Sequence, residues 1–325
     1  MLSRMQAIKF NFTHHIGATM RWKVKLSTFV LFAFFSFTCT SSQPRLLAQP
    51  KVTIALWGDS RENMDNACSD IAHILLYHLT DWDFQIHTGD FTHDGSDAAW
   101  QRSLHYSGID SIFVRGKFYM CTSNHEFKDS SGRDNFDKHT AGVLPINSAD
   151  GTTHFYSHHV SNVDVIFCDG YATNKDVMQL WLDSLLSTIP KNDWIIAVWH
   201  NPTYGDLSYK ESYAETCMPW VESLYKHHCK FIFNGHAHIY LRTKPLRPDG
   251  SLDEKDGIVH VINGTGGASF KDPAPNTTKT AFTPSEKSFP CITFLTIEGN
   301  KAELKTVDAR PGHNLNVIDT YTLTQ

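Results

Sequence analysis

From residue 51 onward, the chain alternates between short apolar runs and longer segments in which apolar residues recur at helical spacing. The apolar runs predict strands at residues 52–57, 84–87, 118–122, 163–168, 194–199, 230–233 and 259–262. The helical spacing predicts helices over 62–80, over 177–186 and around 220–228. Strands that alternate with helices indicate an α/β domain built on a mainly parallel sheet with helices on its faces.

The C-terminal part of the chain follows a different pattern. Residues 291–297 and 302–307 alternate between apolar and polar positions, which predicts a pair of antiparallel strands. The preceding stretch, 271–290, is rich in Pro, Thr, Ser and Lys and predicts a long loop. Because no linker interrupts the pattern, we expect a single domain over residues 51–325.

The first 48 residues differ from the rest because they contain no Asp or Glu. A basic patch at 21–25 leads into an apolar run at 28–37, which is typical of a secretory signal and shorter than a bilayer requires. A membrane anchor or a buried helix are the alternatives. Cleavage near Ala48 is one expectation, and lipidation of Cys39, as in a bacterial lipoprotein, is another. Either way, we expect an exported protein: periplasmic, attached to the cell surface, or secreted.

Charge narrows the range of partners. The chain has 29 Lys+Arg, 34 Asp+Glu and 19 His, with a net charge of −5. Loss of residues 1–48, which carry six basic residues, would change this to −11. Such an acidic chain is a poor electrostatic partner for nucleic acid, so we expect no nucleic-acid-binding surface.

Seven cysteines occur in the chain, and no pair of them has the C-x-x-C spacing of a metal site. Setting Cys39 aside leaves an even number, which permits disulfides. Several of the six lie in or beside predicted strands, so buried free thiols are at least as consistent with the pattern.

Polar residues of a particular kind follow the predicted strands directly. They are two carboxylates, one carboxamide and three imidazoles: Asp59, Asp90, Asn124, His200, His236 and His238. Ligands of open α/β sheets bind outside the carboxyl ends of the strands, so we expect these side chains to converge. Nitrogen and oxygen ligands without thiolate suit transition metals, and six ligands exceed the needs of one ion. Two metals that share a carboxylate can clamp both oxygens of an in-line displacement at phosphorus, which predicts metal-assisted phosphoester hydrolysis.

The order and spacing of these motifs resemble the calcineurin-like metallophosphoesterase superfamily. The motifs are GD at 58–59, GD at 89–90, NHE at 124–126, H at 200 and GHAH at 235–238. Residues 197–204 (AVWHNPTY) and 235–243 (GHAHIYLRT) are most similar to the purple acid phosphatase branch. The resemblance covers roughly residues 51–270. It implies a double β-sandwich flanked by helices, in four layers αββα, and a centre with two metal ions (Fe, Mn or Zn).

The resemblance also implies roles for individual residues. Asp90 would bridge the two metals, Asp59 and His238 would complete the first site, and Asn124, His200 and His236 would complete the second. His125 matches the family histidine that contacts substrate, where a protonated imidazole assists the leaving group. A metal-bound hydroxide would attack phosphorus.

Two positions depart from the purple branch. Arg61 stands where that branch usually has Gly and most of the superfamily has His. A guanidinium cannot ligate a metal, but it can grip a substrate phosphate or form a salt bridge with a carboxylate. His93 stands where the purple branch has the Tyr that binds ferric iron. Ligation by His93 and a place in a surface loop are both open, and we expect no tyrosinate-to-iron absorption band.

These observations predict an exported, metal-dependent phosphoric ester hydrolase that acts on small phosphomonoesters in the manner of an acid phosphatase, with Arg61 and His125 as catalytic residues. A phosphodiesterase of the same superfamily, acting on nucleotides or lipid head groups, is an alternative. Another is a binding protein that keeps the fold without turnover, which the departure at Arg61 motivates. Membrane attachment would require a lipidated Cys39.

Overall fold

The structure is a computed structural model that describes residues 50–204, 214–273 and 275–325. The chain divides into two compact units, Met1–Leu47 and Ala48–Gln325, and the described residues all fall in the second. The predicted signal sequence (1–48) and Cys39 lie outside the described residues. Among the described helices, none combines the length and apolar character needed to cross a membrane.

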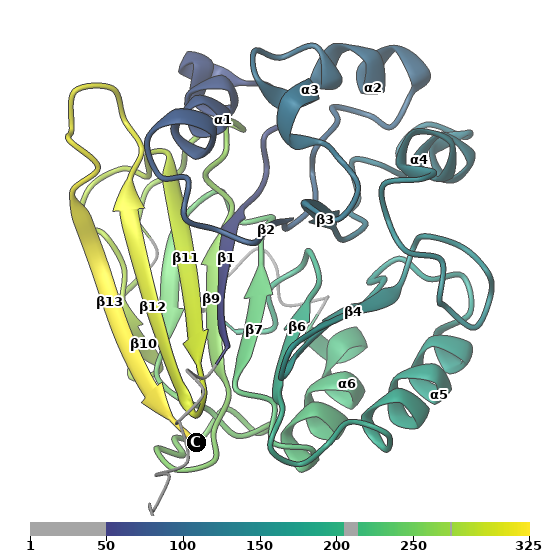
Figure 1. The fold of residues 1–325 in the computed structure, drawn as a ribbon, viewed down its shortest axis with the longest axis vertical. Coiled ribbons are helices and arrows are strands. Elements are labelled where there is room, and N and C mark those ends of the chain that lie inside the picture. The colour runs from purple at the N-terminus through teal and green to yellow at the C-terminus, as the bar shows by residue number, and fades with distance from the viewer. Residues whose placement is uncertain (1–49, 205–213, 274) are drawn as a thin grey trace, which may run out of the picture. The chain divides into compact units, whose positions relative to one another are not determined.

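The first sheet has six strands in the order β13-β12-β11-β1-β2-β3 (Figure 1). Their bounds are β1 Lys51–Trp57, β2 Phe84–His87, β3 Phe118–Met120, β11 Cys291–Glu298, β12 Lys301–Asp308 and β13 Val317–Thr324. β1, β2 and β3 are parallel, whereas β11, β12 and β13 form an antiparallel meander beside β1. Ile54 of β1 therefore pairs with Phe84 on one side and with Leu295 on the other.

The second sheet has seven strands in the order β10-β8-β9-β7-β6-β5-β4. Their bounds are β4 Tyr156–Val160, β5 Val163–Phe167, β6 Trp194–Val198, β7 Phe231–Asn234, β8 Tyr240–Thr243, β9 Val259–Asn263 and β10 Thr280–Phe282. β5, β6, β7 and β9 are parallel, and the outer strands β4, β8 and β10 pair antiparallel. The four parallel strands are buried at every position, as expected for strands covered on both faces.

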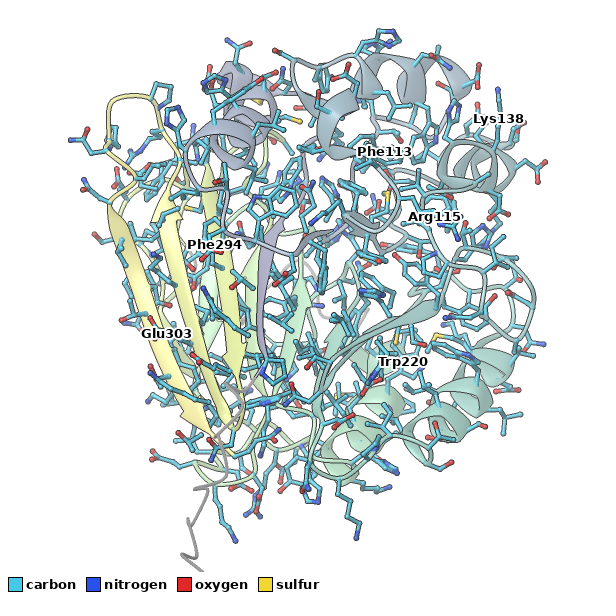
Figure 2. All side chains as sticks on the ribbon, in the orientation of Figure 1. Phe113, Arg115, Lys138, Trp220, Phe294 and Glu303 are labelled. Carbon is cyan, nitrogen blue, oxygen red and sulfur yellow. The ribbon has the colours of Figure 1, made fainter. Side chains whose placement is uncertain are left out.

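Helices cover the faces of the sheets that do not meet each other. The segment that carries β1, β2 and β3 also contains η1 Met64–Asn66, α1 Ala67–Tyr77, α2 Asp97–Leu104, α3 Ile109–Ile112 and α4 Gly132–Thr140. α5 Lys175–Leu186 and α6 Ala214–Lys226 pack side by side against the second sheet (Figure 1). Trp220 of α6 contacts Trp199 edge to face, with ring centroids 5.8 Å apart (Figure 2).

Two apolar clusters hold these layers together. The larger joins β1 and β11 to the inward side chains of β5, β6 and β7, such as Val165, Ile196 and Phe233. The smaller joins the other face of the same three strands to α5 and α6. Next to the edge strand β13, β12 alternates between buried and exposed positions over its first five residues, with Glu303 exposed (Figure 2). The order of layers is helix, sheet, sheet, helix.

This architecture confirms the expected α/β fold with two sheets flanked by helices, and it corrects the expectation of one mainly parallel sheet. Apolar runs mark strands, but they do not say which strands pair. The predicted loop at 271–290 is also wrong in part, because it contains β10, Thr280–Phe282. The six cysteines in the described residues are buried and unpaired.

Candidate metal centre

The predicted site residues follow strands of both sheets. Asp59 and Asp90 come shortly after β1 and β2, and Asn124 comes after β3. His200 follows β6, and His236 and His238 lie in the segment between β7 and β8. The centre is therefore built where the carboxyl ends of the parallel strands of the two sheets meet.

The backbone adopts an unusual conformation at four of these residues. Asp59, Asp90, His236 and His238 have φ values of 57°, 56°, 67° and 55°. This left-handed region is uncommon for residues other than Gly, and such conformations concentrate at functional sites. Gly235 permits one of these turns, since a Cβ there would lie 2.3 Å from Asp59 Oδ2.

Asp59 is fully buried and is held by the neighbouring turn. Both of its oxygens accept the backbone N–H of His236 at 2.9 Å, and its Oδ1 lies 3.5 Å from His238 Nε2. Burial raises the pKa of Asp59 to about 7, because a charge is poorly solvated there. A cation placed against this carboxylate would restore its charged form.

Asp90 lies at the middle of the centre, and its two oxygens face different partners. Oδ1 lies 3.2 Å from His200 Nε2, and Oδ2 lies 3.2 Å from Arg61 Nη1 and 3.8 Å from His125 Nε2. Burial opposes the charged form, but the positive charges of His200, His125 and Arg61 outweigh it and hold the pKa of Asp90 well below its usual range. Asp90 is thus the shared carboxylate of the cluster.

Backbone carbonyls set the orientation of two imidazoles. His200 Nδ1 donates to the carbonyl of Thr88 at 2.7 Å, and His238 Nδ1 donates to the carbonyl of Ser269 at 2.8 Å. A carbonyl only accepts, so Nδ1 carries the proton in both rings and Nε2 faces the centre. Burial would lower the pKa of His200, but the carboxylates of Asp90 and Asp59 raise it to about 9.

His125 lies beside Asp90 and is mostly buried. Its Nδ1 donates to the carbonyl of His93, and Lys128 Nζ lies 2.8 Å from its Nε2. Burial lowers the pKa of His125 to about 4, and the nearby cations Arg61 and Lys128 act in the same direction. The ring is therefore neutral near pH 7 in the free protein.

Arg61 lies inside the centre. Its Nη1 is 3.2 Å from Asp90 Oδ2 and 3.0 Å from His238 Nε2, and its side chain is 9% exposed. The sequence left two roles open for Arg61, binding a substrate phosphate and forming a salt bridge with a carboxylate. The structure shows the salt bridge, and its partner is Asp90, one of the predicted metal ligands.

The remaining two predicted residues, Asn124 and His93, are less buried than the two aspartates. Asn124 is half-buried and accepts from the hydroxyl of Tyr171 at 3.4 Å, and the same hydroxyl donates to Asn201, the neighbour of His200. The ring of His93 packs edge to face against the ring of His125, with centroids 5.9 Å apart. The His93 ring is half exposed, with Nδ1 3.8 Å from Glu62, so metal ligation by His93 stays a prediction.

Comparison with known proteins agrees with this geometry. The sequence profile of calcineurin-like phosphoesterases matches residues 53–240, which is more than half of the chain. The chain belongs to the calcineurin-like phosphoesterase family. Its members are metal-dependent phosphoester hydrolases, and the curated matches place this phosphoesterase beside the purple acid phosphatases.

Three relatives illustrate that placement. Purple acid phosphatase 15 of Arabidopsis thaliana is 25% identical over 209 residues, which is 61% of this chain and 38% of the relative. Purple acid phosphatase 18 of the same plant is 30% identical over 133 residues, or 37% and 30% of the two chains. A purple acid phosphatase from yellow lupin (Lupinus luteus) seeds superposes with a TM-score of 0.67 at 18% identity, covering 85% of this chain and 54% of that chain, which shows a shared fold. The phosphoesterase thus spans about half or less of these relatives.

The donor set of this phosphoesterase fits a transition metal. Ligand atoms of Asp59, Asp90 and His238 all lie within 4.8 Å of one another, and all three residues are buried. On the other side of Asp90, His200 Nε2 lies 3.2 Å from Asp90 Oδ1 and 3.1 Å from His236 Nδ1. Buried carboxylates and imidazoles that share protons in this way are suited to bind a cation instead.

The structure also adds residues that the sequence did not single out. Glu126 is buried and accepts the backbone N–H groups of Asp90 and Thr92 at 3.1 and 2.9 Å, so it fixes the turn that carries Asp90. Lys128 brings a cation to His125. Glu126 directly follows Asn124 and His125, and this adjacency was the available signal. Nothing in the sequence pattern pointed to Lys128.

Proposed function

We propose that this phosphoesterase hydrolyses phosphomonoesters in a metal-dependent reaction, in the manner of an acid phosphatase. One observation carries the proposal: buried carboxylates and imidazoles from both sheets surround Asp90, with the cation Arg61 and the ring of His125 directly against it. A neutral or apolar substrate has no use for such a centre, whereas a phosphate group matches its charge.

Each part of the centre has a task in that reaction. The candidate metal ligands are Asp59, Asp90, Asn124, His200, His236 and His238. Bound metal supplies a Lewis acid and lowers the pKa of water enough to provide a nucleophile. Arg61 neutralises charge on the phosphoryl oxygens, since a guanidinium matches their geometry. His125 donates a proton to the leaving oxygen.

The distribution of charge favours monoesters over diesters. A phosphomonoester carries up to two negative charges near neutral pH, and a diester carries one. Lys128 and Arg61 both lie close to His125, where they raise the local positive potential. Electrostatic attraction for the dianion is therefore stronger than for the monoanion.

Product analysis tests the proposal. The full chain is assayed with an aryl phosphate and with the matching diaryl phosphate, before and after treatment with a chelator. We expect faster turnover of the monoester, loss of activity on chelation, and recovery on addition of metal. A rate ratio near or below one would favour the phosphodiesterase alternative.

The variant Asp90→Asn separates catalysis from binding. Loss of the shared charge is expected to reduce kcat/KM by at least about 100-fold, because it weakens metal binding. Asp81→Asn is the matched control, since Asp81 is a surface residue whose side chain is 92% exposed. Unchanged hydrolysis in Asp90→Asn would mean that the catalytic assignment of this centre is wrong, and absence of hydrolysis in the natural chain would support a binding protein.

We also propose that residues 1–48 direct export and that the mature chain begins near residue 49, with the phosphoesterase domain over 51–325. The basic patch and the short apolar run support this proposal. Mass spectrometry of the chain recovered from an expressing host tests it. A lipid attached to Cys39 would show as added mass, and an intact N-terminus would contradict cleavage.

A further inference from the structure

We propose that the guanidinium of Arg61 replaces one of the two metal ions that the family pattern implies, so that this chain holds a single ion. The single ion would be bound by Asp90, Asn124, His200 and His236. The inference rests on the proposed function, because it assigns the cations of that same centre.

The first argument is steric. Arg61 Nη1 lies 3.2 Å from Asp90 Oδ2 and 3.0 Å from His238 Nε2, which are hydrogen-bond distances. A metal ion bound to the same two atoms would lie about 2.0–2.2 Å from each of them. It would fall in the space that Nη1 fills, so the ion and the guanidinium exclude each other.

The second argument concerns the lone pair of His238. Its Nδ1 donates to the carbonyl of Ser269, so in the neutral ring only Nε2 can act as a ligand. That same nitrogen accepts a hydrogen bond from Arg61. The atom on which the first metal site depends is therefore engaged by a side chain of the protein.

The third argument is electrostatic. A guanidinium is a cation, and Arg61 lies in a buried region where like charges repel strongly. Asp59 and Asp90 attract either a guanidinium or a metal ion. A guanidinium beside these ligands lowers their affinity for a second metal by direct repulsion.

Arg61 is also held in place by its backbone. Its N–H donates to the carbonyl of Asp90 at 3.0 Å, and the hydroxyl of Tyr106 donates to its carbonyl at 3.3 Å. The Nε atom is buried and has no hydrogen-bond partner among the described residues. A guanidinium has five N–H donors, more than the contacts with Asp90 and His238 use, as expected if Arg61 also takes over a metal ion's contact with substrate.

The other half of the centre has a different character. His200 Nε2 lies 3.2 Å from Asp90 Oδ1 and 3.1 Å from His236 Nδ1. Ligand atoms bound to one transition metal at about 2.1 Å are typically about 3 Å apart. The two distances from His200 Nε2 are close to that spacing, and Arg61 engages the other oxygen of Asp90 together with His238, which is why we assign the single ion to this side.

Metal counting tests the inference with a readout other than activity. The full chain, Arg61→Ala and Arg61→Met are reconstituted with Mn²⁺, freed of excess metal, and analysed for metal per chain. We expect about one equivalent in the natural chain and about two in both variants, because the second ligand group is then released. Arg102→Ala, which alters an exposed arginine of α2, is the matched control and should keep the natural value.

Electron paramagnetic resonance gives an independent measurement on the same samples. The natural chain should show the hyperfine pattern of an isolated Mn²⁺ ion, and the Arg61 variants should show exchange coupling between two ions. Circular dichroism establishes whether each variant is folded. If Arg61→Ala does not fold, the metal count of Arg61→Met tests the inference.

The outcomes separate this inference from the proposed function. Two ions in a natural chain that hydrolyses phosphomonoesters would overturn the inference and leave the function intact. One ion in both folded variants would show that Arg61 does not limit the count, which also overturns it. A natural chain that binds no metal and hydrolyses nothing would overturn both.

Discussion

At the scale of single residues, the two oxygens of Asp90 divide the centre. Oδ1 faces His200, and Oδ2 faces Arg61 and the ring of His125. His125, the proposed proton donor, thus lies on the same side as the guanidinium. In the proposed reaction, proton donation and charge neutralisation would both reach the phosphoryl group from this side of Asp90.

The role of His125 leads to a prediction about pH. Burial lowers its pKa to about 4, so the fraction of protonated ring falls as the pH rises through that value. We expect kcat for a phosphomonoester with a poor leaving group to fall over the same pH range. In His125→Ala, kcat should drop by roughly 100- to 10,000-fold, and this fall of kcat with rising pH should disappear.

A comparison of leaving groups distinguishes acid catalysis from structural damage. A nitrophenyl phosphate needs little help from a proton, so its hydrolysis should suffer less in His125→Ala than hydrolysis of an alkyl phosphate. His105→Ala, at an exposed position, is the control. Equal losses for both substrates would argue against proton donation by His125.

At the scale of elements, a buried ion pair joins the two sheets. Arg242 of β8 donates to Asp319 of β13 through Nε at 2.7 Å and through Nη2 at 2.9 Å. The hydroxyl of Tyr240 also donates to Asp319, at 2.9 Å. β8 belongs to the second sheet and β13 to the first, so this pair fixes how the sheets are aligned.

Breaking this pair should be costly. We expect Asp319→Ala to lower the free energy of unfolding by about 3–5 kcal/mol, because it leaves a buried guanidinium without a partner. The matched control is Asp81→Ala, which breaks the exposed Lys51–Asp81 pair at 2.8 Å and should cost far less, because solvent screens an exposed pair. Chemical denaturation measures both.

A double variant makes that test sharper. Replacing both partners, with Arg242→Met and Asp319→Leu, removes the buried charges together and should recover much of the stability lost in Asp319→Ala. Similar small losses in Asp319→Ala and Asp81→Ala would mean that the buried pair does not hold the sheets.

The elements also show what a sequence can reveal about this fold. Strands with continuous apolar runs, such as β1, β5 and β6, were predicted almost to the residue because burial on both faces leaves a local signal. β4 was missed, since its sequence YSHHV is mostly polar. The pairing of β1 with β11 was not predictable, because it depends on residues far apart in the chain.

The same distinction applies to the centre. The sequence placed Asp59, Asp90 and His238 after strand ends, and the structure brings their ligand atoms together. The direction in which a long side chain points cannot be predicted from the local sequence pattern in this way. Arg61 was open between two roles until its contacts with Asp90 and His238 were known. His93 was predicted from its place in a motif. Its ring lies beside Glu62 and His125, and metal ligation by His93 stays a prediction.

At the scale of the whole molecule, a buried histidine should limit stability in acid. His260 of β9 is fully buried, and neither ring nitrogen has a hydrogen-bond partner among the described residues. Burial lowers its pKa to about 3. Between about pH 6.5 and pH 3 the unfolded chain therefore binds more protons than the folded chain, so stability falls as pH falls.

Replacement of His260 should reduce the loss of stability in acid. We expect the drop in unfolding free energy between pH 8 and pH 5 to be about 2 kcal/mol smaller in His260→Leu than in the natural chain. Urea denaturation at both pH values measures the difference, and His105→Gln is the exposed control. An unchanged drop would mean that His260 is not buried in its neutral form.

The thiols give a second prediction for the whole molecule. The six described cysteines are buried and unpaired, and burial raises the pKa of Cys68, Cys217 and Cys229 to about 12. In a Cys39→Ser chain we expect a reductant to leave Tm unchanged. Alkylation should be slow in the native state and should reach all six thiols after denaturation without reductant. A lower Tm with reductant would reveal a disulfide.

The pairing of β1 with β11 affects how the protein is made. Ile54 and Leu295 are neighbours in the sheet but lie about 240 residues apart in the chain. While a ribosome synthesises the protein, β1 emerges early and must wait for β11 before the first sheet can close. During that interval an apolar strand edge is exposed, and a chaperone that binds extended segments would find β1 available. A nascent chain that stops before Cys291 would keep Asp59, Asp90 and β2 but lack β11, which lies on the other side of β1 in the finished sheet.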